Sequence, residues 1–232
     1  MSTVVAINGS PRMGKGDTAL VLAPFLDGMR DAGCDVDLIY ASHLDIEPCA
    51  CGRMYCWYQK PGECCVQDEM QAVYPRLKEA ETLVLATPVY IPLPGRMQDL
   101  VNRLCPLIEP KLVWREGRTR ARFRADVQIR RIVLVATGGW WEAGNMDVVA
   151  HIVEELAANA GVAYAGAVLR PHAFTMRNRG DVTEDGRAVL DAVRRAGYEL
   201  AKDGQMRAET LEAVSRPLIS EEELRERYNR WG

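Results

Sequence analysis

The segment from residue 7 to residue 18 constrains the fold most, because it joins an apolar, β-branched run to the start of an amphipathic helix. The run 3–7 has the composition and length of a buried strand. Downstream, Leu22, Leu26 and Met29 fall on one face of a helix. A tight strand-to-helix turn directs backbone N–H groups and the positive end of a helix dipole to one point. The sequence therefore predicts a phosphate site at this turn.

The side chains of the turn also suit an anion. Ser10 and Thr18 can donate hydroxyl hydrogen bonds, Arg12 can donate a charged bidentate pair, and Gly16 lets the backbone approach closely. The spacing matches neither a P-loop nor a Gly-x-Gly-x-x-Gly turn. Because the Asp17 carboxylate would repel a phosphate, we expect it to cap the helix and to offer only its N–H. The alternative is an ordinary β–α turn capped by Asp17.

The composition excludes several classes of protein. The chain has 232 residues, 29 of them Lys or Arg and 32 Asp or Glu, for a net charge of −3. This balance argues against a protein that coats nucleic acid or binds a membrane surface. No apolar run reaches the roughly 18 residues needed to span a bilayer. The N-terminus shows no signal-peptide pattern, so we expect a cytoplasmic protein.

Strand-like and helix-like segments alternate along the chain. Further strands are predicted at 35–40, 82–87, 132–137 and 162–169. Helices are predicted at 68–78, 96–105, 146–160 and 184–203, with short ones at 208–214 and 221–228. This alternation predicts a doubly wound, five-stranded parallel sheet. Ligands of such sheets bind at the carboxyl ends of the strands, where the unusual loops 9–18, 88–95 and 138–145 begin.

Two long segments and a tail interrupt this pattern. Residues 41–66 are rich in cysteine, and residues 106–128 are rich in arginine. We divide the chain into a domain over 1–204 and a helical extension over 205–232 that packs on the same domain or on a partner subunit. The simplest interpretation of the arginine-rich insert is a solvated loop. Alternatives are contact with the extra phosphate of NADPH and salt bridges between subunits.

Five cysteines occur within 17 residues, namely Cys49, Cys51, Cys56, Cys64 and Cys65. This density is not typical of core packing. Four thiolates can hold an iron–sulfur cluster or a tetrahedral zinc ion. The remaining cysteines, Cys34 and Cys105, and the scattered histidines His43, His151 and His172 are interpreted as structural.

Several of these segments together resemble one family. Residues 8–12 with 16–18, 87–90 with Gly95, and 137–139 resemble the three FMN-contacting loops of the flavodoxin-like NAD(P)H-dependent FMN reductases. Residues 46–70 resemble the cysteine region of the iron–sulfur flavoprotein branch, and the tail from Ser215 to Trp231 is similar to that branch as well.

The resemblance implies a flavodoxin-like fold with strand order 2-1-3-4-5, bound FMN and NAD(P)H as co-substrate. It assigns the phosphate to the first loop, one side of the isoalloxazine ring to the second and the other side to the third. The implied FMN-binding residues are Ser10, Arg12, Gly16, Asp17, Thr18, Pro88, Val89, Tyr90, Ile91, Thr137, Gly138, Gly139 and Trp140. For Trp140 and Trp141 two interpretations are equally open. They are packing or interface residues, or they cover the flavin face on which nicotinamide or substrate stacks. No catalytic side chain is implied, because the flavin performs the chemistry.

The resemblance also suggests a [4Fe–4S] cluster held by Cys49, Cys51, Cys56 and Cys64. The family pattern is a compact Cys-x2-Cys-x2-Cys followed by a fourth cysteine, and this chain departs from that spacing. A lost cluster with residual thiols, a zinc site and a redox disulfide are the alternatives.

The predicted function is an FMN-dependent oxidoreductase. It passes electrons from NAD(P)H or a reduced carrier to a quinone, a disulfide, oxygen or an iron–sulfur acceptor. A non-enzymatic electron carrier or redox sensor is the alternative, and a flavin-free module that binds a phosphorylated ligand is a third. We expect small-molecule or protein electron donors and acceptors and a homo-oligomer, either a dimer or a tetramer.

Overall fold

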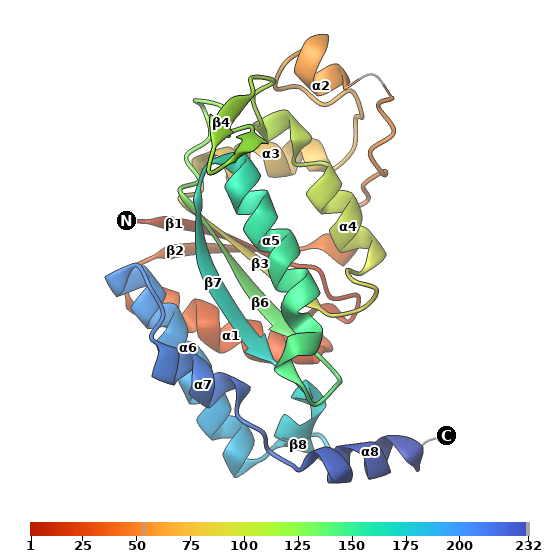
Figure 1. The fold of residues 1–232 in the computed structure, drawn as a ribbon, viewed down its shortest axis with the longest axis vertical. Coiled ribbons are helices and arrows are strands. Elements are labelled where there is room, and N and C mark those ends of the chain that lie inside the picture. Colours follow the sequence, from red (N-terminus) through yellow and green to blue (C-terminus); the bar gives the residue numbers. More distant parts are fainter. Residues whose placement is uncertain (53, 231–232) are drawn as a thin grey trace.

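A computed structural model describes residues 1–52 and 54–230, so Arg53 and Trp231 lie outside the described residues. Its main sheet has five parallel strands in the order β2-β1-β3-β6-β7 (Figure 1). The strands are β1 (Thr3–Asn8), β2 (Asp35–Tyr40), β3 (Thr82–Pro88), β6 (Arg131–Thr137) and β7 (Ala163–Arg170). Counted within the sheet, this order is 2-1-3-4-5, which confirms the predicted flavodoxin-like fold.

Helices cover both faces of the sheet. They are α1 (Asp17–Asp31), α2 (Tyr55–Tyr58), α3 (Met70–Glu79), α4 (Gly95–Asn102), α5 (Asp147–Ala160), α6 (Glu184–Asp203), α7 (Ala208–Ser215) and α8 (Glu221–Asn229). Successive strand residues point to opposite faces. Val4 and Ala6 therefore pack against α1 and α6, whereas Val5 and Ile7 pack against the layer of α3, α4 and α5. Because all five strands run parallel, their carboxyl ends lie at the same edge of the sheet.

The predicted elements agree closely with the observed ones, with one shortened helix. Helix α4 ends at Asn102 rather than at Cys105, and a 3-10 turn follows over Cys105–Leu107. Pro106 accounts for the difference, because it has no N–H to donate to the carbonyl of Asn102, four residues before it. No described helix is both long enough and apolar enough to cross a membrane.

The arginine-rich insert is an ordered hairpin and not a solvated loop. Strands β4 (Val113–Arg115) and β5 (Arg118–Arg120) pair antiparallel. Arg120 is buried and binds Glu155 of α5 at 2.6 Å, and Arg115 donates to the backbone carbonyl of Ala158 in the same helix. The simplest sequence interpretation was therefore wrong, since these guanidinium groups attach the insert to the domain. A second, two-residue hairpin joins β8 (Arg177–Asn178) and β9 (Asp181–Val182).

The C-terminal extension packs on the same chain. Helix α7 lies against α6 and β7, and the buried Arg170 of β7 donates to the carbonyl oxygens of Val214 and Arg216 at 2.9 and 2.7 Å. Helix α8 follows at one end of the longest dimension of the molecule, and α2 lies at the other (Figure 1). The tail thereby places α8 beside the loops that follow β6 and β7.

Candidate functional site

The turn after β1 is held by its own polar groups. The Asn8 side-chain oxygen accepts from the Ser10 N–H at 2.9 Å, and the Ser10 hydroxyl accepts from the Arg12 N–H at 3.3 Å. A Cβ atom on Gly16 would lie 3.0 Å from the Ser10 hydroxyl oxygen, so this position favours glycine. The turn therefore wraps closely around the start of α1, whose first N–H groups lack partners within the helix.

One detail of this turn differs from the prediction. The N-cap of α1 is Gly16, no side-chain capping bond is present there, and Asp17 is the first helical residue. Its carboxylate interacts favourably with the helix dipole without capping the helix. The expected cap was wrong because Gly16 already has the extended backbone conformation that an N-cap requires.

The second and third loops meet the first at the carboxyl ends of β3 and β6. The Val89 N–H donates to the Thr137 carbonyl at 2.9 Å, and the Thr137 and Thr18 hydroxyl oxygens lie 2.8 Å apart. Together the loops surround a cavity of about 330 Å³. Every predicted FMN residue lines this cavity except Ile91, whose side chain is 99% exposed.

Three lining residues were not predicted, namely Ala173, Phe174 and Tyr228. Phe174 follows β7, and its ring packs edge-to-face on that of Tyr228 with the centroids 5.8 Å apart. The Tyr228 hydroxyl donates to the Gly139 carbonyl at 3.3 Å. No local sequence signal marks Tyr228, because only the path of the tail brings α8 to the cavity.

The cavity fits a phosphorylated planar ligand. Arg12 supplies a guanidinium, the start of α1 supplies N–H donors, and the buried Asn8 side-chain nitrogen has no hydrogen-bond partner in the described structure. The neighbouring walls combine an apolar turn at Pro88 and Val89 with aromatic rings. Such walls suit a flat ring system whose polar edge faces backbone groups.

A buried histidine lies behind the third loop. The His172 ring stacks on Trp141 with the ring centroids 6.4 Å apart. Both ring nitrogens lack a hydrogen-bond partner within the described residues. Burial lowers the pKa of His172 to about 4, so the ring is neutral near pH 7. Its surroundings fit the structural interpretation, since it supports the loop and does not line the cavity.

Several thiols of the cysteine-rich segment lie close to one another. Cys51 contacts both Cys49, with the sulfur atoms 3.8 Å apart, and the buried Cys56. Cys56 in turn contacts Cys105, which was interpreted as structural, and Cys64 contacts the Tyr74 hydroxyl. Among the described residues, no three His, Cys, Asp or Glu side chains have the arrangement of a metal site. The ligand set Cys49, Cys51, Cys56 and Cys64 therefore stays a prediction.

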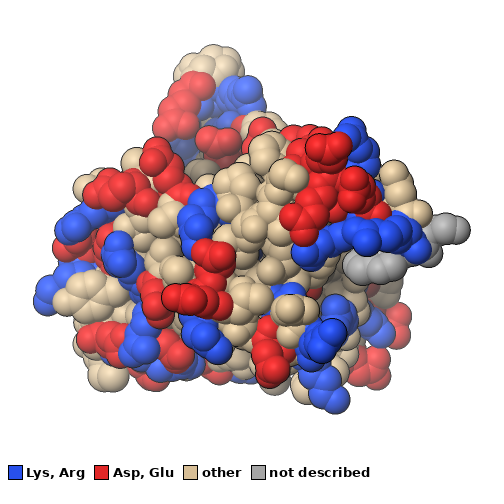
Figure 2. Space-filling model, turned by 90° about the horizontal axis from the view of Figure 1, so that it is seen from below, with Lys and Arg blue, Asp and Glu red and all other residues tan. Residues whose placement is uncertain are grey.

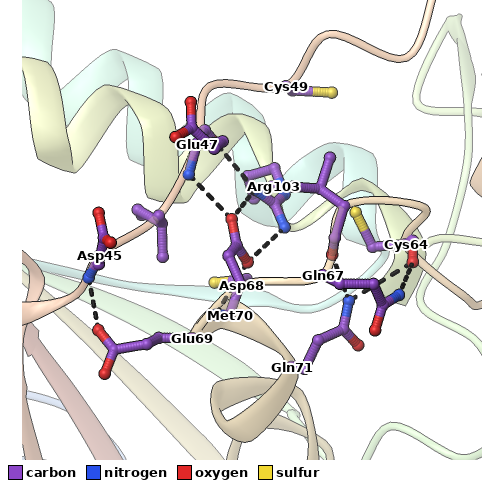
Figure 3. Close-up of polar contacts among 12 residues, drawn as sticks. Asp45, Glu47, Cys49, Cys64, Gln67, Asp68, Glu69, Met70, Gln71 and Arg103 are labelled. Carbon is purple, nitrogen blue, oxygen red and sulfur yellow. Dashed lines mark hydrogen bonds and ion pairs between the residues drawn. The ribbon is translucent and has the colours of Figure 1, made fainter.

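A buried ion pair anchors this segment to the domain. The Arg103 guanidinium binds both carboxylate oxygens of Asp68, at 2.7 and 2.9 Å, and donates to the Glu47 carbonyl at 2.7 Å (Figure 3). The Glu47 N–H also donates to Asp68 at 2.8 Å. The Cys64 carbonyl accepts from Gln71 at 3.4 Å. These contacts fix the two ends of the cysteine-rich segment, whereas the thiols lie outside the network.

Among curated proteins, this chain is similar to iron–sulfur flavoproteins. An iron–sulfur flavoprotein of Methanocaldococcus jannaschii is 29% identical over 105 residues, which cover 45% of this chain and 52% of that protein. One from Archaeoglobus fulgidus is 36% identical over 88 residues, covering 38% of this chain and 42% of its own. The chain thus spans about half the length of the curated relatives it matches.

Solved structures show the same fold. The NAD(P)H:quinone oxidoreductase from Methanothermobacter marburgensis has a TM-score of 0.60 at 16% identity, covering 86% of this chain and 98% of its own. An FMN-dependent NADH-azoreductase from Bacillus anthracis, solved in complex with FMN, has a TM-score of 0.60 at 15% identity, covering 86% and 100%.

The match to a family profile covers more of the chain than the matches to single curated proteins. The sequence profile of the NADPH-dependent FMN reductases matches residues 2–175, which include β1 to β7 and all three loops of the cavity. By this match over well more than half of its length, the chain belongs to the NADPH-dependent FMN reductase family.

Proposed function

We propose that this protein is an FMN-dependent oxidoreductase that takes electrons from NAD(P)H. The observation that carries the proposal is the convergence of three loops on one cavity at the carboxyl ends of β1, β3 and β6. Family membership supports FMN and NADPH as the cofactor and the donor. When bound, FMN supplies the hydride and electron chemistry.

The residues of the chain have distinct roles in this proposal. Ser10, Thr18 and Arg12 bind the phosphate together with the N–H groups at the start of α1. Pro88 and Val89 form one wall for the ring system. Backbone groups of 137–139 face its polar edge, and N–H donors near a reduced flavin stabilise its negative charge.

The electron acceptor is proposed only as a class. The solved neighbours include an NAD(P)H:quinone oxidoreductase and an FMN-dependent NADH-azoreductase. A quinone suits the aromatic surroundings of the cavity. In the overall reaction, NADPH and one proton reduce the quinone to its hydroquinone, and NADP⁺ is the second product.

Steady-state kinetics test this function. Protein loaded with FMN is mixed with NADPH and menadione, and NADPH oxidation is followed by absorbance without oxygen. Turnover that requires both FMN and the quinone supports the enzyme. If NADPH is not oxidised while a reduced ferredoxin exchanges electrons rapidly with the bound flavin, the protein is an electron carrier.

The proposed reaction does not require a [4Fe–4S] cluster, because hydride transfer from NADPH to FMN and reduction of a quinone by the flavin form a complete two-electron path. We therefore expect NADPH–menadione turnover to be unchanged after an iron chelator is applied to anaerobically purified protein. Loss of activity in proportion to lost iron and sulfide would assign a cluster to the electron path.

The oligomeric state is a separate prediction. The sequence predicts a dimer or tetramer, while α8 already closes one side of the cavity within a single chain. Sedimentation velocity of the FMN-loaded protein distinguishes a monomer from these assemblies.

A further inference from the structure

Helix α8 builds a second cavity next to the predicted FMN cavity. The Ser220 hydroxyl caps α8 by accepting from the Glu223 N–H at 3.1 Å, and Leu224 is buried beneath the helix. The Trp141 indole N–H donates to the Ile219 carbonyl at 3.0 Å, just before the helix, and the Tyr228 hydroxyl donates to the Gly139 carbonyl at 3.3 Å. The last two contacts hold α8 against the loop that follows β6. The family match ends at residue 175, so this helix lies outside it.

The second cavity, which we call the α8 groove, has a volume of about 450 Å³. Its walls are the rings of Trp140, Trp141 and Tyr228 and the side chain of Leu224. The Trp140 side chain is 73% exposed, so much of its surface is available to a ligand. An aromatic groove of this volume suits a planar ligand that stacks on an indole.

The charges around the α8 groove favour an uncharged ligand. Glu142 and Glu221 lie on its rim, and Arg225 is the only basic residue in its lining. The Arg225 guanidinium is paired with Glu221 at 3.5 Å, which leaves Glu142 without a basic partner in the lining. The face that carries α8 shows interspersed acidic and basic side chains rather than a basic patch (Figure 2). An anionic ligand would therefore be repelled at the rim.

The α8 groove shares two walls with the predicted FMN cavity. Trp140 and Tyr228 line both cavities, and the Tyr228 hydroxyl contacts the Gly139 carbonyl between them. A Cβ atom on Gly139 would lie 2.8 Å from the Tyr228 hydroxyl oxygen, so α8 approaches the loop closely at this point. A ligand in the groove would thus border the proposed flavin site.

We propose that the α8 groove is a binding site for a planar, uncharged aromatic compound, which is the electron acceptor of the enzyme. The role of the ligand as electron acceptor rests on the proposed function, whereas its binding to the groove does not. The binding site itself is built by Trp140, Trp141, Leu224 and Tyr228, and it exists without the flavin. The acidic rim gives the site its preference for uncharged ring systems.

Two probes with the same ring system test the proposal. Menadione is uncharged, and 1,4-naphthoquinone-2-sulfonate carries one negative charge. Each is titrated calorimetrically into the FMN-loaded protein and into the apoprotein without a reductant, so that no turnover occurs. We expect one menadione site in both forms and roughly tenfold weaker binding of the sulfonate, because one unfavourable charge contact near a surface has about that effect.

Variants separate the α8 groove from the flavin cavity. Glu142→Gln combined with Glu221→Gln changes only groove residues, and we expect it to abolish the preference for menadione while FMN affinity is unchanged. Because Trp140 lines both cavities, Trp140→Ala is compared with the wild type as apoprotein, where we expect menadione binding to weaken roughly tenfold through lost stacking. Trp114→Ala is the matched control, since Trp114 is 77% exposed on β4 and lines neither cavity.

The outcomes distinguish this proposal from the proposed function. Equal binding of both probes, or an unchanged preference in the double variant, would overturn the α8 groove as the site. If FMN displaces menadione from the apoprotein, the ligand binds in the flavin cavity, and this result would also overturn the α8 groove as the site. Absence of FMN binding with intact menadione binding would overturn the proposed function and leave the groove as a binding site.

Discussion

Arg12 is the arginine among the residues that line the predicted FMN cavity, and its guanidinium group can bind the phosphate. We expect Arg12→Ala to weaken FMN binding by on the order of 1.5–3 kcal/mol, because a charge-assisted hydrogen bond to the phosphate is lost. Titration of apoprotein with FMN, followed by quenching of flavin fluorescence, measures the change. Lys15→Ala is the control, since Lys15 lies in the same turn but does not line the cavity. Equal dissociation constants for both variants would place the phosphate elsewhere.

His172 predicts a dependence of stability on pH. Burial lowers its pKa to about 4 from the ordinary value of 6.5. The unfolded chain therefore binds a proton between these values that the native state does not, and the stability falls as the pH is lowered through this range. The expected loss at pH 5 relative to pH 7 is about 2 kcal/mol.

The variant His172→Phe keeps a ring against Trp141 and removes the titrating group. Urea unfolding of both proteins at pH 7 and pH 5 isolates the effect, because carboxylates titrate alike in each. We expect the variant to lose about 2 kcal/mol less than the wild type on acidification. Identical losses would show that His172 is protonated without penalty in the native state.

For individual residues, the sequence predicted which side chains line the cavity. It did not predict which contacts they make. Ser10, Thr18 and Thr137 belong to strand-end loops, whose position follows from the topology of the sheet. Ile91 lies in a similar loop but points to solvent. Tyr228 could not be foreseen, because its place depends on the path of two tail helices that no local pattern specifies.

Helices α1 and α6 pack with their backbones in close contact. A Cβ atom on Gly197 would lie 2.0 Å from the Phe25 carbonyl oxygen. Gly197→Ala should therefore force the helices apart and lower the free energy of unfolding by about 1–3 kcal/mol. In Gly144→Ala, the added carbon would lie 3.6 Å from Asp147, an ordinary contact, so this control should change stability little. Denaturant unfolding of both variants tests the packing, and equal stabilities would contradict it.

The Asp68–Arg103 pair predicts how firmly the cysteine-rich segment is held. Their side chains are 9% and 1% exposed. Asp68→Asn leaves a buried guanidinium without its counter-charge, so we expect a loss of about 3–5 kcal/mol in stability. The exposed pair of Asp37 and Arg76 is the matched control. Asp37→Asn should cost under about 1 kcal/mol. Similar losses in the two variants would show that burial of the pair is unimportant.

Regular elements were predictable because their periodicity reflects burial. The strands 82–87 and 132–137 are continuous apolar runs, and both occupy the centre of the sheet. The arginine-rich insert was not predictable as a hairpin, because Arg120 is buried through an ion pair with Glu155, a residue of a distant helix. Long-range charge pairing of this kind leaves no periodic signal in the sequence.

The two unusual regions of the chain lie at opposite ends of the molecule. The predicted FMN cavity lies near α8, and the cysteine-rich segment extends to α2 at the other end (Figure 1). The fold class and strand order were foreseen, since alternation of strands and helices permits few topologies. The geometry of the cysteines was not, because their spacing departs from the family pattern and no helix or strand orients the described residues 44–52.

The central claim is that the cavity at the strand ends binds FMN through its phosphate. Parallel titrations of the apoprotein with FMN and with riboflavin test it most directly, because the two differ only in that phosphate. We predict that FMN binds at least about 100-fold more tightly than riboflavin, since several charge-assisted hydrogen bonds of roughly 1.5–3 kcal/mol each are available to it. Equal affinities for the two flavins, or no saturable binding of FMN, would contradict the account.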